Sequence, residues 1–317
     1  MAPLAAPSRL RHTLDFHKGP VHTCSFNTGS TYLLSGGSDR QVKLSNPATG
    51  ALVKSYSGHA YEVLSIACTS DNTKFASCGG DRNVLLWDVL EGDVLRRFSG
   101  HTGKINVVKW NDTSSVLASA GFDTAVRLWD AKSSNRVPIQ VLEDSKDSIT
   151  SLVIRDHLIV AGSVDGYLRT WDLRMGELRK DLFDQPITSL AWSNTSHSLV
   201  LLSLLSLSSS HPSLAAQPAA HHLFDVSLGT SLAQYTLSTG YKNENYRIQS
   251  CFSGQSEEAI YGADEEGSIT SWETESGKVI GTKLKGHDRS CLGVLMHPKE
   301  RKMVTWGQDG VIKIWGD

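Results

Sequence analysis

Serine, histidine and aspartate recur together along this chain of 317 residues at a spacing that could serve hydrolysis. His59 is followed by Ser77 and then by Asp81, and the same types return at the same offsets from other histidines. A nucleophilic hydroxyl, a histidine base and an aspartate that orients the base are the parts of a catalytic triad. An enzyme carries one such triad, however, whereas this set returns several times along the chain. The repetition favours a structural role, and we predict that the protein is not an enzyme.

A tryptophan joins the set at a fixed distance, so the pattern is a repeat of four residues. The complete sets are His59, Ser77, Asp81 and Trp87; His101, Ser119, Asp123 and Trp129; and His287, Thr305, Asp309 and Trp315. Another set begins at His17 and has Ser45 in the tryptophan position. The Trp-Asp pairs that begin at Trp87, Trp129 and Trp171 follow one another at equal intervals. Self-similarity at a fixed period indicates a repeat architecture, and the marks along the chain count to seven.

Short strand-like segments lie between these marks. Residues 105–110, 116–120 and 125–129 are rich in β-branched and aromatic types and are separated by turn residues. Four such strands in each of seven units predict an all-β fold, a seven-bladed β-propeller that forms one domain over residues 1–317. Residues 1–8 are expected to be a flexible tail. Because the last unit lacks an outer strand, we expect residues 9–16 to pair with residues 311–315 and close the ring.

Gly-His and Trp-Asp dipeptides mark the repeats, and three of the repeat histidines follow a glycine. These signatures resemble those of the WD-repeat family, whose units are about 40–45 residues long. The resemblance implies that the four repeated residues form a structural hydrogen-bond network in each blade. It also implies that partners bind at a narrow top face. Aligned with the family, the candidate top-face residues are His22, Glu62, Leu64, Lys104, Asn106, Phe122, Ser148, Thr150, Arg247, Gln249 and Gln308.

One unit ends in a motif with a second interpretation. Trp171 and Asp172 are followed after one residue by Arg174. A WD unit that ends in Trp-Asp-x-Arg resembles the docking box of substrate receptors for cullin-RING ubiquitin ligases, whose partner is a ligase adaptor. The alternative is that Arg174 is merely solvated.

Several runs resemble a narrower family, the mitogen-activated protein kinase organizers, which are small seven-bladed WD-repeat proteins also associated with the spliceosome. These runs are YSGHAYEVL at residues 56–64, GGDRNVLLWDV at 79–89, AGSVDGYLRTWDLRMGEL at 161–178 and YKNENY at 241–246. The resemblance implies a scaffold without enzymatic activity that gathers kinase-cascade components and spliceosomal proteins. It also implies a protein of the cytoplasm and the nucleus that is a monomer within larger assemblies.

The fifth unit departs from the repeat between residues 199 and 222, a low-complexity stretch of leucine, serine and alanine. The departure is either an insertion or an error in the underlying transcript. Leucine-rich residues 199–205 are expected to form a strand, whereas residues 206–220 are expected to be poorly packed. His211, His221 and His222 could suggest a metal site, but no acid or cysteine stands at ligand spacing. We interpret these histidines as part of a solvated loop.

Charge and cysteine content exclude several classes of protein. The 31 basic and 33 acidic residues nearly cancel, so no strongly basic surface for direct nucleic-acid binding is expected. The most apolar run, residues 199–207, is far shorter than a membrane helix, which needs about 20 residues. The five cysteines are scattered and contain no CxxC pair, which indicates reduced thiols. We find no motif for a metal or another cofactor.

Overall fold

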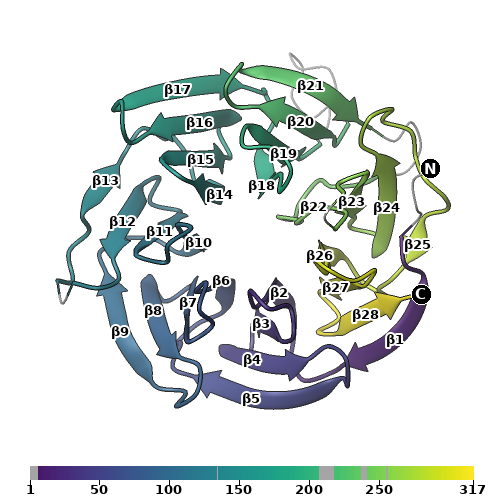
Figure 1. The fold of residues 1–317 in the computed structure, drawn as a ribbon, viewed down its shortest axis with the longest axis horizontal. Helices are drawn as coiled ribbons and strands as arrows, with labels where there is room; N and C mark the ends of the chain where they lie inside the picture. Colours follow the sequence, from purple (N-terminus) through teal and green to yellow (C-terminus); the bar gives the residue numbers. More distant parts are fainter. Residues whose placement is uncertain (1–5, 134, 207–217, 237–240, 255) are drawn as a thin grey trace.

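The computed structural model describes residues 6–133, 135–206, 218–236, 241–254 and 256–317. Seven antiparallel sheets of four strands each stand around a central channel, which confirms the predicted seven-bladed propeller (Figure 1). Within these residues the regular elements are strands, and no helix occurs.

The first three blades follow the chain in order, each from its inner to its outer strand. Blade one contains β2 (Val21–Phe26), β3 (Leu33–Gly37), β4 (Gln41–Asn46) and β5 (Ala51–Ser57). Blade two contains β6 (Val63–Cys68), β7 (Lys74–Gly79), β8 (Asn83–Asp88) and β9 (Val94–Ser99). Blade three contains β10 (Ile105–Trp110), β11 (Val116–Gly121), β12 (Val126–Asp130) and β13 (Gln140–Leu142).

The next three blades continue this order, and blade six has very short inner and outer strands. Blade four contains β14 (Ile149–Arg155), β15 (Leu158–Ser163), β16 (Tyr167–Asp172) and β17 (Glu177–Leu182). Blade five contains β18 (Ile187–Trp192), β19 (Leu199–Leu204), β20 (His221–Asp225) and β21 (Thr230–Tyr235). Blade six contains β22 (Cys251–Phe252), β23 (Ala259–Ala263), β24 (Ser268–Glu273) and β25 (Leu284–Lys285).

Blade seven joins the two ends of the chain. It contains β26 (Cys291–Met296), β27 (Met303–Gly307), β28 (Ile312–Gly316) and, as its outer strand, β1 (Arg9–Leu14). Leu10 lies opposite Trp315 and Leu14 opposite Ile312, so the predicted closure is confirmed. The closing strand ends at Leu14, slightly earlier than expected. Closure pairs two strand edges that would otherwise be open to other chains.

The start of the chain differs from the expected tail. Ala6 packs against the cluster around Ile248 and Pro7 is buried, so the described part of residues 1–8 is anchored to the body. Residues 1–5 lie outside the described residues.

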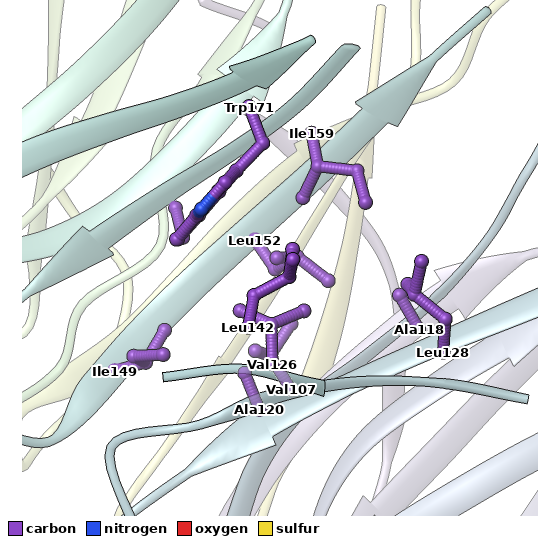
Figure 2. Close-up of a cluster of buried hydrophobic side chains, with 11 residues drawn as sticks. Val107, Ala118, Ala120, Val126, Leu128, Leu142, Ile149, Leu152, Ile159 and Trp171 are labelled. Carbon is purple, nitrogen blue, oxygen red and sulfur yellow. The ribbon is translucent and has the colours of Figure 1, made fainter. Parts of the chain in front are cut away.

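Apolar packing between neighbouring blades forms the core. Strands of the middle layers, such as β7 and β8, are buried over nearly their whole length, whereas the outer strand β9 is largely exposed. Both faces of a middle strand are covered by adjacent blades, so its residues are apolar in runs rather than in alternation. Figure 2 shows the cluster between blades three and four, to which Val107, Leu128, Leu152 and Trp171 belong.

Blade five is more regular than the sequence indicated. The strand expected at residues 199–205 is present as β19, and a second strand, β20, begins at His221. Ala219 and Ala220 are buried, so the expectation of poor packing is wrong for these two residues. Residues 207–217, which include His211, lie outside the described residues.

Candidate functional site

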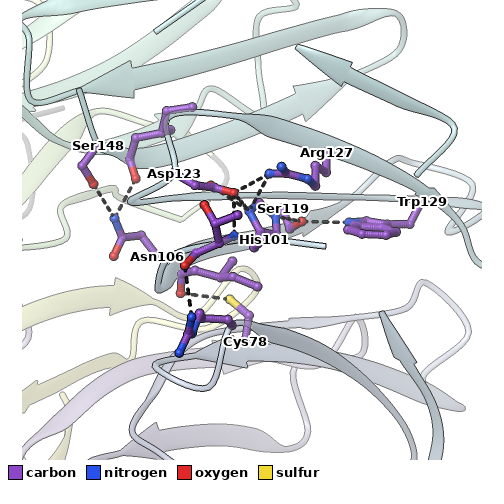
Figure 3. Close-up of polar contacts among 12 residues, drawn as sticks. Cys78, His101, Asn106, Ser119, Asp123, Arg127, Trp129 and Ser148 are labelled. Carbon is purple, nitrogen blue, oxygen red and sulfur yellow. Dashed lines mark hydrogen bonds and ion pairs between the residues drawn. The ribbon is translucent and has the colours of Figure 1, made fainter. Parts of the chain in front are cut away.

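The repeated residues meet in hydrogen-bonded chains inside their blades. In blade three, Nδ1 of His101 lies 2.8 Å from Oδ1 of Asp123, and Nε2 lies 2.7 Å from Oγ of Ser119 (Figure 3). The indole N–H of Trp129 donates to the same hydroxyl at 2.8 Å. With the proton on Nδ1, every donor in this chain meets an acceptor. Burial lowers the pKa of His101, which keeps its ring neutral at pH 7.

The same geometry returns in two other blades. In blade two the three contacts of His59, Ser77, Asp81 and Trp87 measure 2.7, 2.6 and 2.7 Å. In blade seven those of His287, Thr305, Asp309 and Trp315 measure 2.8, 2.8 and 2.9 Å. The three hydroxyl residues are fully buried. A substrate has no access to them, so the triad-like arrangement cannot supply a nucleophile.

A cation placed four residues after the aspartate adds to the network, and it was not anticipated from the sequence. Arg127 contacts Asp123 at 2.5 Å, Lys43 contacts Asp39 at 3.3 Å, and in blade two the position holds apolar Leu85. Burial alone would raise the pKa of Asp39, but hydrogen bonds from His17 outweigh it and hold that pKa at about 2. The sequence signal for this contact is a Lys or Arg four residues after the repeat aspartate.

The top of blades two and three carries the most exposed part of the candidate top face. We call Glu62, Lys104 and Phe122 the rim patch. Lys104 donates to Glu62 at 2.7 Å, and the Phe122 side chain is largely solvated, with 58% of the residue exposed. The backbone N–H of Phe122 donates to the Lys104 carbonyl at 2.9 Å, which fixes the turn that presents the ring. The Phe122 ring is therefore open to solvent.

Two other candidate top-face residues are buried, which corrects the sequence-based assignment. Asn106 and Ser148 are each 7% exposed and hydrogen-bond to one another at 3.1 Å (Figure 3). Asn106 also donates to the Ile149 carbonyl at 2.7 Å. These contacts join blade three to blade four, so the two side chains are engaged in the fold and cannot contact a partner.

Arg247 crosses the channel from blade six. Its guanidinium donates to the carbonyls of Leu64 at 3.1 Å, Asn106 at 2.6 Å and Thr150 at 3.1 Å, which belong to blades two, three and four. Burial lowers the pKa of Arg247 to about 10, so the group stays charged at neutral pH. Arg247 therefore spans the channel, whereas Leu64 and Thr150 contact it through their carbonyls and are themselves partly exposed.

The remaining candidates are partly exposed. His22 pairs with Oγ of Ser38 at 2.9 Å, and burial lowers its pKa to about 4. The backbone N–H of Gln249 donates to the Leu292 carbonyl, and the backbone N–H of Gln308 donates to the Ser290 carbonyl.

Comparison with known proteins agrees with this architecture. Residues 8–45, 50–88, 92–130 and 136–172 match the model of the WD domain, G-beta repeat. WD repeat domain-containing protein 83 of Xenopus tropicalis is 44% identical over 309 residues, covering 98% of this chain and 92% of that protein. The chain belongs to the WD-repeat family. The human protein of the same name is 41% identical over 99% of this chain and 93% of its own length. An uncharacterized WD repeat-containing protein of Schizosaccharomyces pombe is 50% identical over 86% of this chain and 88% of its own.

The WD-repeat network is modified in blade four. Ala161 pairs with Arg169 across the strands, and Ser119 pairs with Arg127 at the same position of blade three. Blade four therefore lacks the hydroxyl group of the network. Arg169 is fully buried and donates to Asp165 at 2.7 Å and to Oγ of Ser163 at 2.7 Å. The indole of Trp171 donates to Asp144 at 3.2 Å instead. An ion pair replaces the histidine chain, so this WD unit is still held by polar contacts.

His221 does not lie in a solvated loop, and that interpretation was wrong. It begins β20, is 1% exposed, and accepts or donates a hydrogen bond with Oγ of Ser203 at 2.8 Å. Its ring lies 5.0 Å from that of Trp272 in blade six. A Cβ at Gly262 would lie 2.4 Å from Nε2 of His221, so only glycine leaves room for the ring. Burial lowers the pKa of His221 to about 3.

The Trp-Asp-x-Arg motif lies at the turn between β16 and β17. Trp171 is buried, whereas Arg174 is exposed. The Arg174 backbone N–H donates to Asp172 at 2.8 Å, which shapes the turn. Successive turns of an antiparallel blade lie at opposite ends, so Arg174 faces away from the end that carries the rim patch.

The described residues contain neither a metal-binding cluster nor a membrane-spanning helix. No group of three His, Cys, Asp or Glu side chains there could hold a metal ion. No helix in that part of the chain is long and apolar enough to cross a membrane. All five cysteines are free, and burial raises the pKa of the Cys68 and Cys251 thiols to about 12.

Proposed function

We propose that this protein is a non-enzymatic scaffold that organises components of a mitogen-activated protein kinase cascade and associates with pre-mRNA splicing complexes. Its WD-repeat propeller suggests a protein-interaction platform. The rim patch supports this role most directly, because an exposed phenylalanine stands near a charged pair on a turn that backbone hydrogen bonds hold in place. Aromatic side chains of this kind are common among interface residues that dominate binding energy.

The named cascade and splicing partners rest on the runs of residues shared with the kinase organizers, YSGHAYEVL at 56–64 above all. This run contains Glu62, so the resemblance and the rim patch coincide in blade two. The same resemblance supports a cytoplasmic and nuclear protein whose partners are proteins. The rim patch contains one lysine paired with one glutamate, which favours a protein partner over nucleic acid.

The test is a quantitative pull-down from lysate with the double variant Phe122→Ala and Lys104→Glu. We expect recovery of at least one kinase-cascade or spliceosomal partner to fall roughly tenfold or more, with the melting temperature unchanged. The matched control is Leu90→Ala with Lys132→Glu, an exposed pair on turns at the opposite end of the blades. Undiminished recovery of every partner by the rim variant would contradict binding at the rim patch.

A second candidate function is that of a substrate receptor of a cullin-RING ubiquitin ligase. The exposure of Arg174 beside buried Trp171 favours it, because a docking arginine must reach its adaptor. The same pull-down with Arg174→Glu separates the two functions. Loss of a cullin adaptor with this variant would support ligase docking, whereas absence of an adaptor from the wild-type sample would contradict it.

A further inference from the structure

The channel encloses a cavity of about 280 Å³ between the inner strands. Its lining includes Ser65 of blade two, Lys109 of blade three, Ser151 of blade four and Ser189 of blade five, and Arg247 also borders it. At about 30 Å³ for each water, the cavity holds the equivalent of about nine water molecules. That space fits a small ion with some water.

The cavity has positive charge without a matching negative charge. Lys109 and Arg247 both line it, and none of its described lining residues is an aspartate or a glutamate. Arg247 donates to carbonyls, whereas the Lys109 ammonium has no hydrogen bond or ion pair to any described residue. Burial lowers the pKa of Lys109, and the Arg247 charge lowers it further. Lys109 is partly exposed, and its charge and that of Arg247 repel one another in a cavity that has no carboxylate, which makes the cavity favourable for an anion.

Hydroxyl groups line the same cavity, and one of them has a free hydrogen-bonding capacity. Ser151 is 7% exposed, and its Oγ has no hydrogen-bond partner among the described residues. Its neighbours are already engaged, because Ser189 accepts from the Ser250 backbone and Thr188 donates to the Ser203 carbonyl. That Oγ is closed off from the cavity, so it cannot contact a ligand there. The polar contacts of a bound ligand would therefore come from Lys109 and Arg247.

We propose that this channel cavity binds a phosphate-class oxyanion, held by Lys109 of blade three and Arg247 of blade six. A phosphate dianion matches the two cations in charge and offers several acceptor oxygens. Arg247 keeps donors for it, because only three of its five N–H groups are used by the carbonyls. The bound ion would link blade three to blade six through one centre. This site is separate from the rim patch and does not depend on the proposed scaffold function.

The experiment uses the full chain and inorganic phosphate at constant ionic strength, with chloride as the balancing ion. Isothermal titration calorimetry should show one saturable site in the wild type, and the melting temperature should rise with phosphate. Lys109→Met should weaken binding at least tenfold and remove most of that rise. Lys132→Met, which alters an exposed lysine on a turn outside the channel, is the matched control and should behave as the wild type.

The stability of the variant in the absence of phosphate gives a second, independent readout. Because Lys109→Met removes a charge that repels Arg247, we expect its melting temperature in chloride to equal or exceed that of the wild type. A purely structural lysine would give the opposite result. Lys109→Arg, which keeps the charge, should retain phosphate binding. Absence of saturable binding to the wild type, or equal binding to Lys109→Met, would overturn the proposal.

A competition experiment between glycerol phosphate and inorganic phosphate identifies the source of the phosphate group. Tighter binding of the ester would identify a phosphorylated metabolite as the ligand. Tighter binding of the inorganic ion would identify free phosphate. Chloride that displaces phosphate at equal concentration would overturn the assignment to the phosphate class.

Discussion

Blade three and blade six use a tryptophan at the same register, but they satisfy its surroundings in different ways. In blade three, Trp129 donates to Ser119, which is bound in turn to His101 of the same unit. In blade six, Gly262 occupies the position of that serine, and the Trp272 indole N–H has no hydrogen-bond partner among the described residues. The ring of His221, from blade five, packs into the space.

The two blades differ in how far their packing depends on side chains from another blade. The network of blade three is closed within one repeat of the sequence, so its strands are positioned by residues of their own unit. Blade six lacks a closed network and depends on a side chain from its neighbour. We therefore expect damage in blade three to stay local and damage in blade five to spread to blade six.

The largest effect is expected from removing an aspartate of the closed networks. Asp123 contacts both His101 and Arg127, whereas Asp81 contacts His59 and faces Leu85 at the cation position. Asp123→Ala should cost about 3–5 kcal/mol of stability, because it leaves the buried charge of Arg127 uncompensated. Asp81→Ala should cost only about 1–3 kcal/mol.

Hydrogen exchange of strands β10–β12 and β6–β8 measures the loss of stability in each blade separately. This measurement does not require the whole propeller to unfold in one step. Asp123→Asn is the matched control, since it keeps the shape of the side chain. Equal losses for the two alanine variants would show that the cation adds nothing to the network.

A smaller effect is expected from acid, and it should begin at the junction of blades five and six. The pKa of His221 is about 3 in the folded protein and about 6.5 when unfolded, so the unfolded state binds the extra proton between these values. The contribution of neutral His221 to the free energy of unfolding is therefore fully present above pH 6.5 and is lost as the pH falls towards 3. At about 1.4 kcal/mol for each pH unit, the loss at pH 5 is about 2 kcal/mol.

Hydrogen exchange of β20 and β24 at pH 6.5 and pH 5, corrected for intrinsic rates, tests this expectation. His221→Phe keeps a ring in the space beside Gly262 and should abolish the pH dependence of both strands. Persistence of that dependence in the variant would assign it to another group, such as His222, whose pKa burial lowers to about 4.

The smallest effect concerns the turn that presents Phe122. Thr124 adopts a φ of 61°, whereas Gly166 and Gly310 occupy the corresponding turn position in blades four and seven. A β-branched residue is strained in this left-handed region, and glycine is not. After the flexibility cost of glycine is subtracted, Thr124→Gly should raise stability by about 0.5 kcal/mol. Chemical denaturation measures this change in the free energy of unfolding, and Thr113→Gly, on an exposed turn, is the control. A lower stability for Thr124→Gly would contradict the strain at Thr124.

The number of blades, the closure by the N-terminal strand and the residues of the repeated sets were all predicted from the sequence. These follow from local patterns that recur at fixed spacing, and such patterns survive without any knowledge of tertiary contacts. Prediction failed where a residue acts outside its own repeat. His221 was assigned to a loop because its neighbours are serine and alanine, and Asn106 and Ser148 were assigned to a surface although they bond across two blades.

What the sequence determined by itself is the repeating unit, because the hydroxyl, histidine, aspartate and tryptophan of one unit satisfy one another within a single repeat of the chain. Only the tertiary structure decided what the ring encloses. Arg247 reaches carbonyls of residues between 97 and 183 positions away in the sequence, and Lys109 meets the same cavity from another blade. No local pattern encodes these distances, since closing the ring is what brings the inner strands together around a common centre.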